Sequence, residues 1–345
     1  MPRFYDVFTE DIAAKFELDE MDNFEKFANA GLVPPDGFNA PLYVMWELTS
    51  ACPNRCVYCY NDSHYKREME LSGKQKFQIA DQIIDAGVFQ ICLTGGEPRA
   101  CPEYLDLIRY LRTNGVDVGT ILSGALLTKK DIQEISEFLV MVQISLDGSN
   151  AAIHDKVRDR EGSFKEAIFA IEEFIKRGVI VKVSFATTRY NIHDFKNVYE
   201  LCSKLGVSSV RTQPLAITGR AKQNEKDIYP TREQYKELEE FIRSKAQNPK
   251  GNIPIEYRNP YEHVKFGLKN GYAFVARITS QGLVGISPYV NVYFGDLKKE
   301  SLIDIWKRMN KGWHIPKMME ISRILISRGD GILYDPTEET IFLGG

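Results

Sequence analysis

Apolar runs with strand character alternate with amphipathic segments between residues 42 and 215. The strand-like runs occupy residues 42–48, 88–94, 116–122, 139–146, 179–187 and 208–215. Helical patterns lie between them at about 74–86, 102–113, 128–137, 164–177 and 194–205. Four of these helical segments are followed by a glycine that suits the left-handed end of a helix: Gly87, Gly115, Gly178 and Gly206. The alternation predicts an α/β fold of parallel βαβ units, and periodicity alone leaves open a partial barrel or a wound sheet.

The two ends of the chain follow other patterns. Phe4, Phe8, Ile12 and Phe16 recur every four residues, which predicts an N-terminal helix. After residue 216 we expect, in order, a polar connection at 217–227, a charged helix at 231–247, a break at 249–260, short β segments at 272–294, a helix at 301–309 and a hairpin at 331–343. The predicted domains are a helical extension (1–40), a βα region (41–220) and a linker helix with a small C-terminal domain (221–345).

Composition limits the possible partners and compartment. The 345 residues carry a net charge of -3, so nothing global favours nucleic acid. No apolar run approaches the roughly 20 residues of a membrane helix, and the N-terminus has no signal-peptide pattern. Six cysteines in so long a chain do not suggest a disulfide framework, and we expect a cytoplasmic protein. None of these cysteines follows Cys202.

Three cysteines form the chain's most informative motif. Cys52, Cys56 and Cys59 follow the first strand-like run, and parallel α/β barrels place their chemistry at the carboxyl ends of strands. Soft thiolates select iron–sulfur clusters, zinc or copper(I), and three ligands leave a fourth position open. The alternative is a structural zinc site completed by His64, although zinc sites usually pair two Cys-x2-Cys units and only one is present.

A second motif, Gly95-Gly96-Glu97-Pro98, ends the next strand-like run. Two glycines allow the backbone to approach a ligand closely, and the carboxylate can pair with an ammonium group. Alone, this sequence could be an ordinary turn between a strand and a helix. Its position one strand after the cysteines favours a functional interpretation.

Together the two motifs resemble the radical S-adenosylmethionine (SAM) superfamily over roughly residues 42–220. The resemblance implies a partial (β/α)6 barrel and one 4Fe–4S cluster on Cys52, Cys56 and Cys59, with SAM chelating the open iron. Gly95, Gly96, Glu97 and Pro98 would surround the methionine amino group. The other implied contacts are the Tyr58 backbone with adenine, Ser123, Ser145 and Asp147 with the ribose or carboxylate, Arg158 with the SAM carboxylate, and Gln213 with SAM or substrate. No catalytic residue is predicted.

The segments ISLDGSNAAIHDKVRDREGSF and RTQPLAITGRA are similar to the branch that carries a C-terminal SPASM or twitch domain, many of whose members mature ribosomally made peptides. This predicts a small α+β C-terminal cap. The chain departs from that branch because no cysteine is available there for an auxiliary cluster. Cys92, Cys101 and Cys202 have the surroundings of buried structural cysteines, so we expect a single cluster.

The resemblance implies that one electron cleaves SAM and that the 5′-deoxyadenosyl radical abstracts a hydrogen atom from the substrate. We expect a peptide substrate and an external one-electron donor of the flavodoxin or ferredoxin type. The alternatives are radical tailoring of a cofactor or small molecule in a haem, quinone or antibiotic pathway, and a zinc-stabilised binding protein without catalysis.

Overall fold

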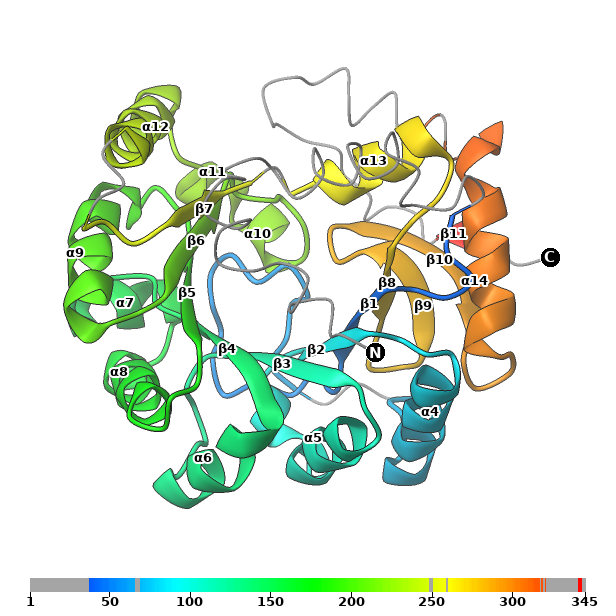
Figure 1. Cartoon of the computed structure of the whole chain (residues 1–345). Helices are drawn as coiled ribbons and strands as arrows, with labels where there is room; N and C mark the ends of the chain where they lie inside the picture. Colours follow the sequence, from blue (N-terminus) through cyan, green and yellow to red (C-terminus); the bar gives the residue numbers. More distant parts are fainter. Residues whose placement is uncertain are drawn as a thin grey trace.

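The computed structural model describes residues 37–65, 69–247, 251–258, 260–316, 318, 320 and 341–342. The predicted N-terminal helix lies outside these residues, as does most of the predicted terminal hairpin. The described chain forms one sheet of eleven strands, in the order β11-β10-β9-β8-β1-β2-β3-β4-β5-β6-β7. The sheet curves around a central interior, with helices on its outer face (Figure 1).

Six consecutive parallel strands form the middle of the sheet. They are β1 (Tyr43–Glu47), β2 (Gln90–Thr94), β3 (Asp117–Leu122), β4 (Leu139–Ser145), β5 (Val181–Ala186) and β6 (Ser209–Gln213). Each coincides with a predicted strand, so these predictions are confirmed. Alternate residues such as Val44, Ile91 and Val210 are buried against the helices, and the residues between them face the interior.

The helices begin and end where local chemistry favours it. Their bounds are α4 (Gly73–Asp85), α5 (Tyr104–Thr113), α6 (Lys129–Ile135), α7 (Ala151–Arg158), α8 (Ser163–Ile175), α9 (Phe195–Leu205), α10 (Arg220–Gln223), α11 (Glu225–Ile228), α12 (Arg232–Ala246), α13 (Glu262–Asn270) and α14 (Leu302–Lys311). Ser72 and Gln75 form a capping box at the start of α4. Gly206, at φ 82°, ends α9 in the left-handed region, as predicted.

Strands from the C-terminal region extend the same sheet at both edges. These are β7 (Ile255–Tyr257), β8 (Val275–Ile278), β9 (Leu283–Ser287), β10 (Val290–Asp296) and β11 (Ile341–Phe342). β7 pairs with β6 and β8 with β1, both in parallel, while β9 runs antiparallel to its neighbours β8 and β10. The predicted α/β partial barrel is confirmed. The predicted domain boundary at residue 220 stays a prediction, and strands on both sides of it share this sheet.

Three predictions for the later chain were wrong or incomplete. The predicted break at 249–260 contains β7, because an edge strand tolerates Pro254 before it while Ile255 and Tyr257 pack on the core. The predicted polar connection at 217–227 contains α10 and α11, each of four residues and too short to show helical periodicity. Helix α13 was not predicted, since no element was assigned between the break at 249–260 and the β segments that begin at residue 272.

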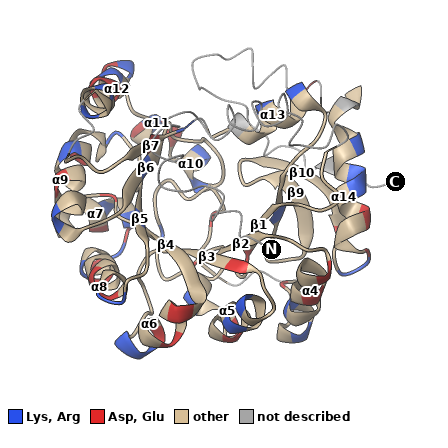
Figure 2. Ribbon diagram, in the orientation of Figure 1, with Lys and Arg blue, Asp and Glu red and all other residues tan. Residues whose placement is uncertain are grey.

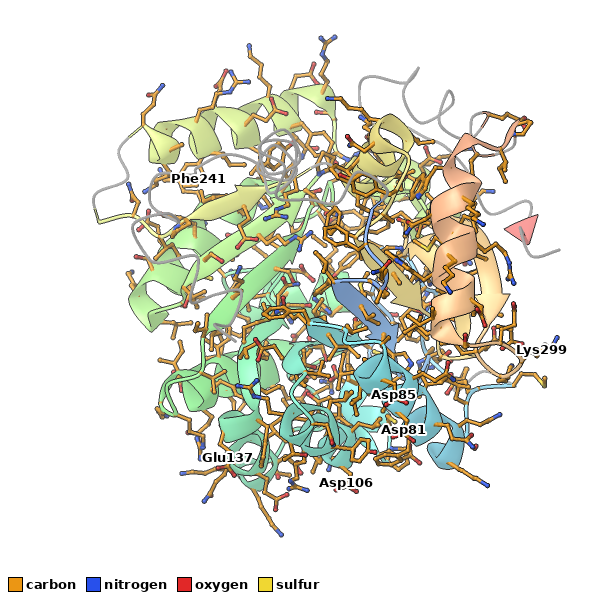
Figure 3. The ribbon with its side chains drawn as sticks, turned by 45° about the vertical axis from the view of Figure 1, so that its right-hand side comes forward. Asp81, Asp85, Asp106, Glu137, Phe241 and Lys299 are labelled. Carbon is orange, nitrogen blue, oxygen red and sulfur yellow. The ribbon has the colours of Figure 1, made fainter. Side chains whose placement is uncertain are left out.

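Charged residues lie mainly on the outer helices (Figure 2). Asp81, Asp85, Asp106 and Glu137 are exposed residues on the outer helices (Figure 3). None of the helices in the described part of the chain is both long and apolar enough to cross a bilayer.

Candidate active site

The cysteine loop, residues 48–63, follows β1 and lies within the curve of the sheet (Figure 1). Helix α7 holds one side of the loop through the main chain. The Arg55 N–H donates to the Arg158 carbonyl (3.1 Å), and the Val57 N–H donates to the Val157 carbonyl (3.0 Å). The loop is therefore placed by an element about a hundred residues further along the chain.

Arg220, the first residue of α10, clamps the other side of the loop. Its guanidinium donates to the carbonyls of Cys56 and Ser63, both at 3.0 Å, and pairs with Asp62 at 2.7 Å. Its backbone N–H donates to the Cys59 carbonyl (2.8 Å). A Cβ at the preceding Gly219 would lie 2.3 Å from the Tyr60 carbonyl oxygen, so glycine is required for this approach. Sequence reasoning missed this clamp, and its only signal was Gly-Arg just after the sixth strand.

The three thiols are partly or fully enclosed. Cys56 is buried, while Cys52 and Cys59 are half-buried. Burial, with smaller contributions from Glu97 and the neighbouring thiols, raises the pKa of Cys52 to about 12. Burial also raises the pKa of Cys56 to about 11, against the opposing effect of Arg158. Both thiols are therefore protonated at neutral pH, and metal binding must release their protons.

The Gly95–Pro98 turn packs directly on the cysteine loop. The Gly96 N–H donates to the Thr49 carbonyl (2.6 Å), and the Glu97 N–H donates to the Ala51 carbonyl (2.8 Å). A Cβ on either glycine would come within 2.4 Å of one of these carbonyl oxygens. The structure thus gives the glycines a reason that the sequence did not show, the close approach of two backbone segments. Their predicted contact with SAM stays a prediction.

Glu97 is completely buried at the end of β2. Its Oε2 accepts hydrogen bonds from the N–H and the hydroxyl of Ser123, whereas Oε1 has no partner among the described residues. Burial raises the pKa of Glu97 to about 7 against the lowering effect of Ser123. An orphan carboxylate oxygen in a buried position suits a cationic donor such as an ammonium group. Ser123 therefore binds Glu97 in this structure, and its own predicted contact with SAM stays a prediction.

Asp147 and Arg158 form a buried ion pair beneath the cysteine loop. Arg158 Nε donates to Asp147 Oδ2 (2.6 Å), and its Nη1 approaches Cys56 Sγ at 3.6 Å. The Tyr58 hydroxyl donates to the same carboxylate oxygen, while the Ala186 N–H donates to Oδ1 (2.9 Å). Both oxygens of Asp147 thus accept hydrogen bonds from the protein, and the carboxylate orients Arg158 and Tyr58. Its predicted contact with SAM stays a prediction.

The remaining predicted contacts lie on interior strand faces. The Ser145 hydroxyl accepts a weak hydrogen bond from Ser184 (3.4 Å). Gln213 ends β6, and its Nε2 donates to the Tyr289 hydroxyl (2.8 Å). Tyr289, which follows β9, packs edge-on against Tyr60 at 5.7 Å between ring centroids. This aromatic contact links the cysteine loop to the C-terminal strands, and sequence reasoning did not find it.

A second buried ion pair fixes the seam between β1 and β8. Arg277 Nε and Nη2 donate to the two carboxylate oxygens of Glu47 at 2.9 and 3.1 Å. Tyr60 donates to the same carboxylate at 3.2 Å, so the loop is tied to this pair as well. The register of β1 points Glu47 into the interior, which the sequence had left undecided.

The donor set fits an iron–sulfur cluster. Three thiols on one short loop influence one another's pKa, and an unpartnered buried carboxylate oxygen lies near enough to affect Cys52. No three His, Cys, Asp or Glu side chains converge tightly on one point within the described ranges. The other cysteines lie apart. Cys92, Cys101 and Cys202 are buried elsewhere in the fold.

Residues 46–202, which include both motifs, match the Radical SAM superfamily. Residues 46–202 therefore carry a radical SAM domain, and this superfamily uses a 4Fe–4S cluster and SAM. The predicted resemblance is confirmed.

Among curated relatives, the mycofactocin maturase MftC of Mycolicibacterium smegmatis is 33% identical over 212 residues, 61% of this chain and 54% of the maturase. The AdoMet-dependent heme synthase of Methanosarcina barkeri is 26% identical over 290 residues, 78% of this chain and 83% of the synthase. The chain thus spans about half the length of the maturase. A crystal structure of Streptococcus suis SuiB bound to precursor peptide SuiA shares the fold, with a TM-score of 0.66, 13% identity, and coverage of 86% of this chain and 69% of SuiB.

Proposed function

We propose that this protein modifies a ribosomally made precursor peptide by radical chemistry. The similarity to a maturase and the fold shared with a peptide-bound enzyme support a peptide substrate. The open arrangement of the sheet, with β7 and β8 separated in the strand order by all six central strands, is also compatible with a long substrate.

The observation that carries the catalytic part is the buried, unpartnered Oε1 of Glu97 beside the cysteine loop. In this proposal Cys52, Cys56 and Cys59 bind the cluster and Glu97 accepts hydrogen bonds from the SAM ammonium group. Arg158, oriented by Asp147, is available for the SAM carboxylate. When bound, the cluster supplies the electron that cleaves SAM to the 5′-deoxyadenosyl radical. The chain's own residues hold the substrate carbon in position and exclude competing reactions.

The electron would come from a separate protein of the flavodoxin or ferredoxin type. The sequence has no cysteine after Cys202, so we propose one cluster and no internal relay in the C-terminal region. A purified donor of this type should replace dithionite in turnover assays. Failure of every flavodoxin and ferredoxin from the same cell to support turnover, under conditions where dithionite does, would contradict this part of the proposal.

Anaerobic reconstitution tests the proposal. The wild-type chain should bind about four irons and form 5′-deoxyadenosine only when both SAM and dithionite are present. A precursor peptide encoded beside this gene should then lose mass through the net removal of hydrogen. Formation of 5′-deoxyadenosine without any change in such peptides would reject the peptide substrate while leaving the radical chemistry intact.

A second candidate is oxidative tailoring of a porphyrin. The heme synthase aligns with more of this chain than the maturase does, and this chain covers more of the synthase. An iron porphyrin with propionate side chains should then be consumed in a SAM-dependent reaction. Absence of any such change under conditions that produce 5′-deoxyadenosine would remove this candidate.

A further inference from the structure

Arg211 is an exception among the charged residues of the sheet. The described strands contain three basic residues, namely Lys182 in β5, Arg211 in β6 and Arg277 in β8. Lys182 pairs with Glu256 at 2.8 Å, and Arg277 pairs with Glu47 at 2.8 Å. Arg211 makes no side-chain hydrogen bond or ion pair in the part of the chain that the structure describes. The Arg211 side chain is half-buried, so its charge is partly withdrawn from water without a counter-charge among the described residues.

The strand register directs Arg211 into the interior of the barrel. Its neighbours Val210 and Thr212 are buried on the helix-facing side, and Arg211 lies opposite Ser184 of β5. On the other side it lies opposite Glu256 of β7, whose carboxylate accepts instead from Lys182 and Ser209. The nearest strand carboxylate is therefore already used.

Electrostatic effects show how far the Arg211 guanidinium reaches. It lowers the pKa of Cys92 in β2, against a larger increase caused by burial. It also contributes, after burial, to lowering the pKa of His263 in α13 to about 4. β2 and β6 are separated by three strands of the curved sheet, so an arginine that affects both Cys92 and His263 reaches into the central interior (Figure 1).

His263 lies within the electrostatic influence of Arg211 and provides a second polar group for the same site. Its Nε2 is buried and has no hydrogen-bond partner among the described residues. With a pKa of about 4 the imidazole is neutral at pH 7, so it brings one N–H but no charge. One cation and one neutral donor match a group with a single negative charge, whereas a phosphate dianion would need more donors.

We infer that Arg211 and His263 form a binding site for a carboxylate of the substrate, inside the barrel and two residues deeper along β6 than Gln213. The inference rests on the proposed function and names the chemistry of its substrate. In a peptide, the carboxylate comes from an Asp or Glu side chain or from the C-terminus. In the porphyrin alternative it is a propionate.

Three small probes of one scaffold test the site on the reconstituted full-length chain. N-acetyl-glutamic acid α-amide carries a side-chain carboxylate, N-acetyl-glutamine carries a terminal carboxylate, and N-acetyl-glutamine α-amide carries none. We expect calorimetry to detect binding of one or both carboxylates and at least tenfold weaker binding of the diamide. Equal binding of all three probes would overturn the site.

Variants show whether Arg211 is responsible. Arg211→Gln should weaken carboxylate binding at least tenfold, and Arg211→Lys should recover part of it. The exposed Arg189, whose guanidinium donates to backbone carbonyls outside the barrel, provides the matched control Arg189→Gln, which should bind as wild type. Equal binding by Arg211→Gln and Arg189→Gln would contradict the proposal.

Thermal unfolding distinguishes a ligand-binding arginine from a structural one. Arg211→Gln removes an unpaired charge, so its midpoint should equal or exceed that of the wild type. Lys182→Gln leaves Glu256 without its main partner and should lower the midpoint. An equal loss in both variants would show that Arg211 is structural and would reject the site.

Two outcomes distinguish failure of the carboxylate-binding site from failure of the proposed peptide substrate. If carboxylates bind through Arg211 but no precursor peptide is modified, the site stands and the peptide substrate fails. If a precursor peptide is modified at the same kcat/KM by wild type and Arg211→Gln, the peptide substrate stands and the site fails. Binding of a propionate-bearing porphyrin in preference to both acidic probes would assign the site to the second candidate function.

Discussion

The cysteine loop and the C-terminal strands are stabilised in different ways. The loop is held by hydrogen bonds that it donates to backbone carbonyls of α7, such as that of Arg158, and by hydrogen bonds that it accepts from Arg220 of α10. Its apolar support is a small cluster formed by Leu215, Ile217, Ala221 and Ile228. In contrast, β8–β10 and α14 belong to the main apolar core, where Phe294 and Trp306 are fully buried.

Because of this difference, we expect mutations in the loop to affect cofactor binding and mutations in the C-terminal strands to affect global stability. A polar network sets a particular loop shape, and losing one member costs about 0.5–3 kcal/mol locally. An apolar core stabilises the whole chain, and truncation of a large core side chain costs more. We therefore expect changes in the loop network to alter iron binding first, and changes around α14 to alter unfolding first.

Removal of the three thiols should have the largest effect. A Cys52/Cys56/Cys59→Ala variant should bind essentially no iron after anaerobic reconstitution, compared with about four irons in the wild type. Its fold should persist, because the loop contributes little to the main core. Cys101→Ala is the control and should retain the wild-type iron content. Residual cluster in the triple variant would mean that Cys92, Cys101 or Cys202 binds metal.

Trp306→Ala should have the next largest effect, now on stability. Trp306 is fully buried in α14, and its indole N–H donates to the Phe38 carbonyl (2.7 Å). We expect the free energy of unfolding in denaturant to fall by about 3–5 kcal/mol. Iron bound per folded chain should not change. A loss of iron at temperatures where the variant is still folded would show that the two regions are coupled.

The parallel strands could be predicted because each is an apolar run bounded by a turn, a signal local to a few residues. Cys52, Cys56 and Cys59 were equally visible, since their spacing has no packing purpose. Arg220 was not, because its role depends on Cys56 and Ser63, more than 150 residues away in the chain. No local pattern records such a contact.

The structure also changed the interpretation of residues that were predicted. Gly95 and Gly96 are predicted to let a ligand approach, and the structure adds that the carbonyls of Thr49 and Ala51 also require them. Asp147 is predicted to contact SAM, and the structure adds that its oxygens accept hydrogen bonds from Arg158, Tyr58 and Ala186. Sequence identifies which residues gather at the strand ends. Which of their atoms remain free depends on tertiary contacts.

Buried polar groups near the loop should make stability depend on pH. The Asp147 N–H donates to Nδ1 of His154 (3.0 Å), and burial lowers the pKa of His154 from 6.5 to about 4. As pH falls below 6.5, the unfolded chain binds a proton that the folded chain does not. The free energy of unfolding should therefore fall as the pH is lowered from 6.5 to about 4. The expected loss is about 3 kcal/mol, at roughly 1.4 kcal/mol per pKa unit.

Replacement of His154 tests that dependence. His154→Asn retains an acceptor for the Asp147 N–H and should remove this part of the pH dependence, measured as the denaturant midpoint at several pH values. The exposed His193 supplies the control, and His193→Asn should behave as wild type. An unchanged pH profile in His154→Asn would assign the effect to another group.

Arg220→Ala should have the smallest effect of the set, confined to the cysteine loop. The change removes hydrogen bonds from a charged donor to Cys56 and Ser63, each worth about 1.5–3 kcal/mol. Because α10 lies outside the main core, iron should transfer to a chelator roughly tenfold faster while the unfolding midpoint changes little. Arg243→Ala, which removes an exposed pair with Glu239 in α12, is the matched control and should release iron at the wild-type rate. If both variants release iron equally, the polar clamp does not control the loop, and the contrast with the C-terminal strands loses its basis.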